Sequence, residues 1–159
     1  MHEATVVVPV DGVNYQIRRM TPAVGSYIWQ RLMAAVYKAS EGQKDEAPVE
    51  PAEPAEPAVE APQPSSAERL RASAGRLRAT CGVAFMYLGF DDFEFVQKNC
   101  MRMLSREEPN MGYIPVVADS GQWAAKDLEA NLFIITRLMV EVLVVNLASF
   151  LEFGAAVSK

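Results

Sequence analysis

The sequence predicts a predominantly α-helical α+β protein, in which an N-terminal β-hairpin precedes about four helices arranged as a bundle. Two valine-rich runs meet at Asp11-Gly12, apolar residues then recur at helical spacing, and a Pro/Glu-rich stretch separates two well-patterned regions. We therefore divide the chain into residues 1–40, with the hairpin and first helix, an acidic linker over 41–64, and a helical part over 65–159. The first and third parts are expected to pack together as one domain.

The N-terminal region has the pattern of a hairpin followed by a capped helix. Residues 4–10 and 13–19 are the two expected strands, and the Asp-Gly dipeptide between them tolerates the positive φ of a type I′ turn. Thr21 followed by Pro22 predicts a helix start, with the hydroxyl as N-cap and the proline where its missing donor costs nothing. This helix is expected to end near Ser40. Its apolar stripe consists of Val24, Tyr27, Ile28, Leu32, Ala35 and Val36.

The linker is set apart by composition. Its sequence EGQKDEAPVEPAEPAEPAVEAPQP interleaves proline with glutamate and alanine and has almost no large apolar side chains. Such a stretch has too little apolar surface to bury to offset the conformational entropy that it would lose on ordering. We therefore expect a disordered, solvated, polyproline-II-rich tether. Two interpretations stay open: a tolerated surface insertion, or a functional segment that acts as a PxxP-type ligand or an acidic lure.

Two helices are predicted directly after the linker. Ser65 and Glu68 have the spacing of a capping box, and the helix that they open is expected to run toward Gly89. Asp91 or Asp92 is then expected to cap the next helix, where its negative charge also suits the helix dipole.

The C-terminal third is predicted as a loop followed by a long apolar helix. Prolines and glycines interrupt residues 107–121, although 114–117 has the composition of a short strand that would pair near the hairpin. The helix is expected over 122–153. Arg137 and Glu141 are four residues apart and can pair in a soluble fold, which argues against a membrane span. Such an apolar helix is either the central helix of the bundle or part of a partner interface.

Composition argues against several function classes. A net charge of −5 disfavours nucleic-acid binding, and no signal peptide is apparent, so a cytosolic protein is expected. Cys81 and Cys100 have no CxxC spacing and are expected to be buried free thiols in a reducing compartment. His2 is the single histidine, so we expect no catalytic, metal or cofactor site. The spaced arginines are expected to form the wet side of an amphipathic helix: Arg69, Arg71, Arg76 and Arg78.

A partner-binding role is the remaining class. Methionines are frequent after the linker, and methionine suits surfaces that repack against varied partners, although it also serves as flexible core filler. Tryptophan near a loop is equally ambiguous. We place the candidate partner-binding surface on the end of the third helix and on the last helix, at Met101, Met103, Leu104, Trp123, Leu132, Ile135, Met139 and Val142.

Several segments together resemble the tail assembly chaperones of long-tailed, siphovirus-like bacteriophages. They are VNYQIRRMTPAVG, FDDFEFVQKNCMRML and PVVADSGQWAAKDLEANLFIITRLMVEVLVVNLASF. The resemblance rests on the order of hairpin, helices and final helix and covers both patterned regions. The linker departs from the compact form expected of the family.

The resemblance implies a small non-enzymatic protein, made in the host cytoplasm and absent from the mature virion, that keeps the tape measure protein soluble while tail tube subunits polymerise around it. It also implies that a frameshifted longer form recruits the tail tube protein. Self-association is left open. The alternatives are a structural tail or head-tail connector protein that stays in the virion and a small membrane-associated protein, with an enzyme as the weakest reading.

Overall fold

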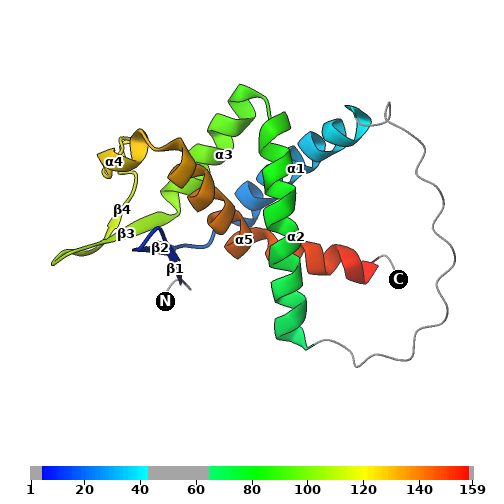
Figure 1. Ribbon diagram of the computed structural model, residues 1–159, viewed down its shortest axis with the longest axis horizontal. Helices are drawn as coiled ribbons and strands as arrows, with labels where there is room; N and C mark the ends of the chain where they lie inside the picture. The colour runs from blue at the N-terminus through cyan, green and yellow to red at the C-terminus, as the bar shows by residue number, and fades with distance from the viewer. Residues whose placement is uncertain (1–4, 43–64, 158–159) are drawn as a thin grey trace, which may run out of the picture.

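The computed structural model describes residues 5–42 and 65–157, and it has the α+β fold that the sequence predicts (Figure 1). His2 and residues 43–64 of the predicted linker lie outside the described residues, whereas residues 41–42 form the end of α1. The strands are β1 (Val6–Val10), β2 (Val13–Ile17), β3 (Leu104–Glu108) and β4 (Gly112–Pro115). The helices are α1 (Pro22–Gly42), α2 (Ser66–Tyr87), α3 (Phe90–Arg102), α4 (Lys126–Glu129) and α5 (Leu132–Val157).

The four strands form one antiparallel sheet in the order β1-β2-β3-β4. The predicted hairpin is confirmed: Val10 pairs with Val13 across a turn in which Asp11 has φ 53° and Gly12 has φ 78°. Both angles lie in the left-handed region that a type I′ turn requires. Pairing of Ile17 with Leu104 then joins the N-terminal hairpin to the C-terminal half of the chain.

The second hairpin corrects part of the prediction. Leu104 was expected at the end of a helix and 107–121 as a loop with one strand, yet β3 and β4 pair from Ser105 to Pro115. Asn110 lies in the turn between β3 and β4 with a φ of 65°, and Gly112, the first residue of β4, has a φ of 72°. The expected strand lies slightly earlier than predicted, and it reaches the N-terminal hairpin through β3.

The starts of α2 and α3 differ in how they are capped. The Ser65 hydroxyl accepts a hydrogen bond from the Glu68 N–H at 3.2 Å, and the Glu68 carboxylate accepts one from the Ser65 N–H at 2.7 Å, so the predicted capping box is confirmed. The expected aspartate cap of α3 is wrong, because Gly89 occupies the N-cap position. Asp91 and Asp92 lie in the first turn instead, where their charge still favours the helix dipole.

The predicted last helix is divided in two. The short α4 ends near Ala130, and α5 begins at Leu132, where the Asn131 side chain accepts a hydrogen bond from the Ile134 N–H at 3.2 Å. Trp123 therefore lies in the preceding loop, paired with Val117 in an isolated β-bridge. An asparagine cap satisfies a free N–H of a new helix start, which the apolar pattern alone did not reveal.

α5 is the central helix of the helical part, as the first of the two predicted alternatives expects, and the second alternative, a partner interface on this helix, stays a prediction. It contacts α1, α2, α3, α4 and β1, and its described part buries side chains on more than one side. The predicted pairing of Arg137 with Glu141 is not formed: Glu141 accepts hydrogen bonds from Arg78 of α2 at 2.8 and 3.2 Å. Within the part of the chain that the structure describes, no helix combines the length and apolar character needed to cross a bilayer.

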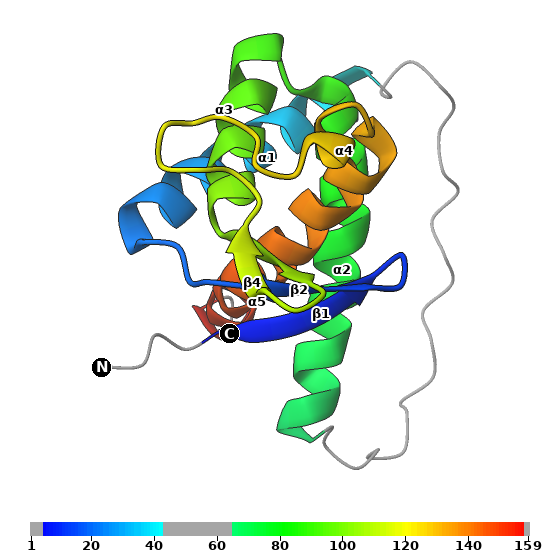
Figure 2. The ribbon, with the colours of Figure 1, turned by 90° about the vertical axis from the view of Figure 1, so that its left-hand side faces the viewer.

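The Asn146 side chain connects the end of the first hairpin to α5 through hydrogen bonds. Its side-chain oxygen accepts a hydrogen bond from the Met20 N–H at 2.7 Å, and its amide donates to the carbonyls of Val142 at 2.9 Å and Arg18 at 3.4 Å. These bonds fix the segment between β2 and α1 against α5. The sheet lies at the left of the molecule in Figure 1 and faces the viewer in Figure 2, while the N-terminal half of α2 projects beyond the other helices in both views.

Candidate functional site

The two cysteine thiols are buried in the core and are not exposed nucleophiles. Both are free, as predicted. Burial raises the pKa of the Cys81 thiol from 9.0 to about 12, and burial followed by the neighbouring Cys81 raises the pKa of the Cys100 thiol further. A neutral, inaccessible thiol is a poor nucleophile and a poor metal ligand. Across residues 5–42 and 65–157 no group of three or more His, Cys, Asp or Glu side chains has the arrangement of a metal site.

The predicted partner-binding residues do not form one surface. Five of them are core side chains with almost no exposed surface: Met101, Leu104, Ile135, Met139 and Val142. They belong to the single hydrophobic core of the described residues, to which the sheet and the helices α1, α2, α3 and α5 contribute. Met103 and Trp123 are half-buried, and Leu132 is 62% exposed at the start of α5. The apolar character of the five core residues therefore stabilises the fold. Of the eight predicted residues, Leu132, Met103 and Trp123 are the ones with appreciable exposed surface.

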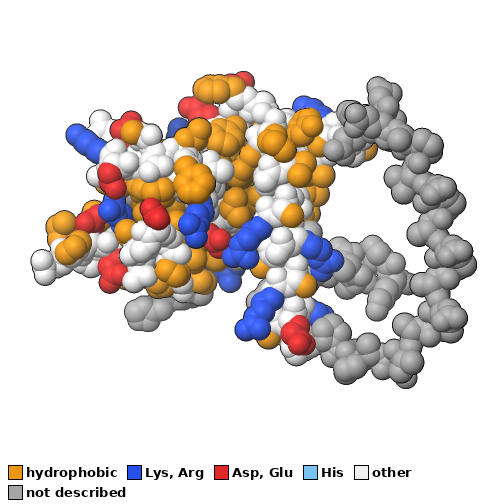
Figure 3. Space-filling view, in the orientation of Figure 1, with side chains coloured by type: hydrophobic (Ala, Val, Ile, Leu, Met, Phe, Trp, Pro, Cys, Tyr) orange, Lys and Arg blue, Asp and Glu red, His pale blue; other side chains and the backbone are white. Residues whose placement is uncertain are grey.

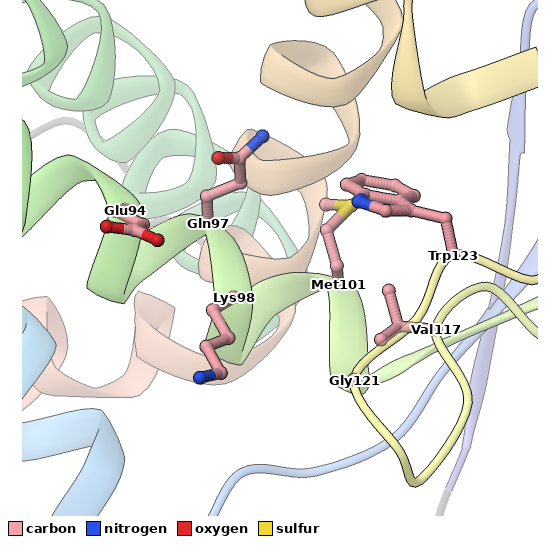
Figure 4. Close-up of a pocket in the computed structure, with 7 residues that line it drawn as sticks. All are labelled: Glu94, Gln97, Lys98, Met101, Val117, Gly121 and Trp123. Atoms are coloured by element: carbon pink, nitrogen blue, oxygen red, sulfur yellow. The ribbon is translucent and has the colours of Figure 1, made fainter. Parts of the chain in front are cut away.

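Met101 and Trp123 are brought together at a small pocket between α3 and the loop after β4. The Met101 side chain points toward the Trp123 indole, and Val117 lies below them (Figure 4). The remaining lining residues, which make the pocket partly polar, are Glu94, Gln97, Lys98 and Gly121. The pocket has a volume of about 230 Å³. This is smaller than usual small-molecule sites, which suits one inserted side chain of a partner better than a cofactor.

A more exposed apolar cluster lies where α2 ends and α3 begins. We call it the corner cluster, and it consists of Val83, Met86, Tyr87 and Phe90. Met86 and Phe90 are 74% and 79% exposed, and Val83 and Tyr87 are 38% and 43% exposed. Three of the four lie on the last turns of α2, and Phe90 opens α3. Hydrophobic side chains accordingly gather at the upper end of α2 (Figure 3).

The corner cluster was not predicted from the sequence. The structure turns Leu77, Cys81 and Ala84 inward, which places Val83 outside. The one signal in the sequence was the dense run of large apolar residues around Gly89, where two helices of different direction had to meet. Two helices that meet at a corner cannot bury every side chain of their junction.

Aromatic and ionic contacts hold α1 against α3 beside this corner. The Tyr27 and Phe95 rings meet edge to face with centroids 4.9 Å apart. Arg31 lies over the Tyr27 ring at 4.7 Å and forms an ion pair with Asp92 at 3.2 Å. These contacts fix the direction of α3 and therefore the position of Phe90 at its start.

The chain was compared with protein-family models, with curated proteins and with solved structures, and no match was found in any of the three.

Proposed function

We propose that this protein is a non-enzymatic tail assembly chaperone of a long-tailed bacteriophage, which binds the tape measure protein and keeps it soluble while the tail tube assembles. The observation that carries the proposal is the corner cluster, where Met86 and Phe90 leave about three quarters of their surface exposed. Clustered exposed apolar side chains are typical of a protein-binding surface. The sequence resemblance supplies the class of partner.

The chemistry of the corner cluster suits a chaperone. Met86 is long and unbranched, so it can adapt to different partner side chains, while Tyr87 and Phe90 offer rigid aromatic area. The net charge of −5 keeps a complex with an apolar client dispersed. On this proposal the protein acts in the host cytoplasm and leaves before the virion matures, and a frameshifted longer form would add contacts to the tail tube protein.

The test is co-expression with the tape measure protein of the same phage, followed by measurement of the soluble, co-purifying client. Met86→Ala combined with Phe90→Ala should reduce soluble client strongly, because it removes the most exposed apolar contacts of the cluster. Neither substitution opens a cavity in the core, so the fold is expected to persist, which circular dichroism checks.

Two matched variants sharpen this test. Met111→Ala with Tyr37→Ala removes one exposed methionine and one exposed aromatic elsewhere, and it should leave client solubility unchanged. Leu132→Ala with Phe133→Ala tests the exposed start of α5, which holds one of the predicted residues. An insoluble client in the presence of wild-type protein, with this protein retained in purified particles, would instead favour a structural tail or connector protein.

A further inference from the structure

The outer face of α2 carries arginines in two rows. Arg69 and Arg76 are seven residues apart, as are Arg71 and Arg78, so each pair stacks along the helix at a spacing of about two turns. All four side chains are exposed; Arg69, Arg71 and Arg76 lie in the N-terminal half of α2, which projects from the molecule, whereas Arg78 lies farther along and contacts Glu141 of α5. Basic side chains accordingly lie along both sides of the lower half of α2 (Figure 3).

Four small side chains and one methionine lie between the two rows. Ala72, Gly75, Ala79, Gly82 and Met86 are exposed and recur at alternating intervals of three and four residues. This is the a/d spacing of a heptad repeat, and it puts the four arginines at the flanking e and g positions. We call the two rows together with this seam the arginine face.

The two glycines of the seam have no explanation within the fold. A Cβ atom built on Gly75 or Gly82 meets nothing within 4 Å, so no neighbouring element requires the missing side chain. Glycine inside a helix destabilises it relative to alanine. A second helix that approached the seam would use both glycines, because small side chains allow the two axes to lie close together.

We propose that the arginine face binds an acidic amphipathic helix of a partner protein, whose apolar side chains lie over the seam and whose glutamates or aspartates pair with the arginines. Among the described residues Arg78 has an ion pair, with Glu141, whereas Arg69, Arg71 and Arg76 have none. A second copy of this chain is disfavoured as the occupant, because it would place arginine rows opposite arginine rows. The seam continues through Met86 into the corner cluster, so one partner helix can contact both.

This proposal does not depend on the partner being a tape measure protein, and its test uses designed probes. The first probe is a fluorescently labelled peptide of about five heptads, with leucine at a and d and glutamate at e and g. The second has lysine in place of every glutamate. Fluorescence anisotropy with the full chain at low ionic strength should show binding of the acidic peptide and none of the lysine peptide. The net charge of −5 makes such a preference informative, since the protein as a whole repels an acidic ligand.

Charge reversal provides the sharper test. Arg69→Glu combined with Arg76→Glu should weaken binding of the acidic peptide by about tenfold or more, since it replaces two attractions by two repulsions. The same variant should gain affinity for the lysine peptide, which a misfolded protein would not do. Lys126→Glu combined with Arg137→Glu makes the same change in net charge at exposed positions on α4 and α5, and it should leave binding of the acidic peptide within about twofold.

Four outcomes would overturn the proposal. The first is equal binding of the two peptides by the wild-type chain, and the second is equal loss of binding in both charge-reversal variants. The third is displacement of the acidic peptide by duplex DNA at lower concentration than by unlabelled peptide, which would indicate a nucleic-acid surface. The fourth is binding that appears only after Glu50, Glu53 and Glu56 are changed to Gln, which would make the chain's own segment the occupant.

Discussion

At the scale of single residues, Asn146 connects elements that are far apart in the sequence. It accepts a hydrogen bond from the Met20 N–H and donates to the Arg18 carbonyl, more than 120 residues away. The Met20 N–H precedes α1 and loses its acceptor when Asn146 is shortened. A partly buried donor without an acceptor costs about 1–3 kcal/mol.

We therefore expect Asn146→Ala to lower the free energy of unfolding by about 1–3 kcal/mol in urea denaturation. Asn99→Ala is the matched control, because Asn99 also donates to the carbonyl four residues earlier, that of Phe95, without holding a distant segment. The control should lose about 0.5 kcal/mol or less. Equal losses in the two variants would mean that the contact with Met20 contributes nothing.

The buried thiols give a second prediction at this scale. Burial raises the pKa of Cys81 to about 12, so in the folded protein neither thiol should react with a thiol reagent at pH 8, whereas both should react in urea. Below pH 9 the thiols are neutral in both states, and above pH 9 they ionise in the unfolded chain first, so stability falls as pH rises. Cys81→Ala should make this fall smaller, and rapid labelling of the native protein would contradict the burial.

At the scale of elements, α2 should be less stable than its length suggests. Gly75 and Gly82 lie inside it with open space at their Cβ positions. Gly75→Ala and Gly82→Ala are each expected to raise the free energy of unfolding by about 0.5–1 kcal/mol, measured by urea denaturation. Gly12→Ala is the contrasting control, since its φ of 78° makes a side chain unfavourable and should destabilise the hairpin. Destabilisation by both helix substitutions would indicate a packing role for the glycines that the structure does not contain.

Elements that depend on local chemistry were predictable, and elements that depend on distant partners were not. The Asp11-Gly12 turn and the Ser65–Glu68 capping box each involve a few adjacent residues, and both are as expected. β3 has the polar sequence LSREE and pairs with β2, almost ninety residues earlier. No local pattern indicates such a pairing, so the sequence prediction left β3 out.

The candidate surface was less predictable than the fold, for a related reason. The rotation of a helix about its axis decides which of its apolar side chains are exposed, and that rotation is set by the other elements. Met101 and Met139 thus became core, while Met86 became one of the most exposed apolar side chains. The arginines of α2 were expected on its solvent-facing side and are exposed. This was predictable because charged side chains are almost never buried without a partner.

At the scale of the whole molecule, the two described parts of the chain form one body through contacts that do not need the segment between them. β2 of the first part pairs with β3 of the second, and Arg31 pairs with Asp92. α1 packs on α2, α3 and α5. These contacts bury apolar side chains from both parts in one core, which includes Ile28 and Leu32 on α1 together with Leu138 and Leu143 on α5.

We therefore expect the two parts to stay together after the backbone between them is cut. A site for a sequence-specific protease placed between residues 50 and 55 allows this cut, and the products should co-elute in size-exclusion chromatography as a particle of unchanged size. The cut chain should still unfold in a single urea transition, at a lower midpoint and with a new dependence on protein concentration, because the cut turns one folding chain into two that must associate. The uncut variant is the control for the inserted site. Separate elution of the fragments under native conditions would mean that the sheet and the shared core are too weak to hold the two parts together, and the chain would then be two units joined by a tether.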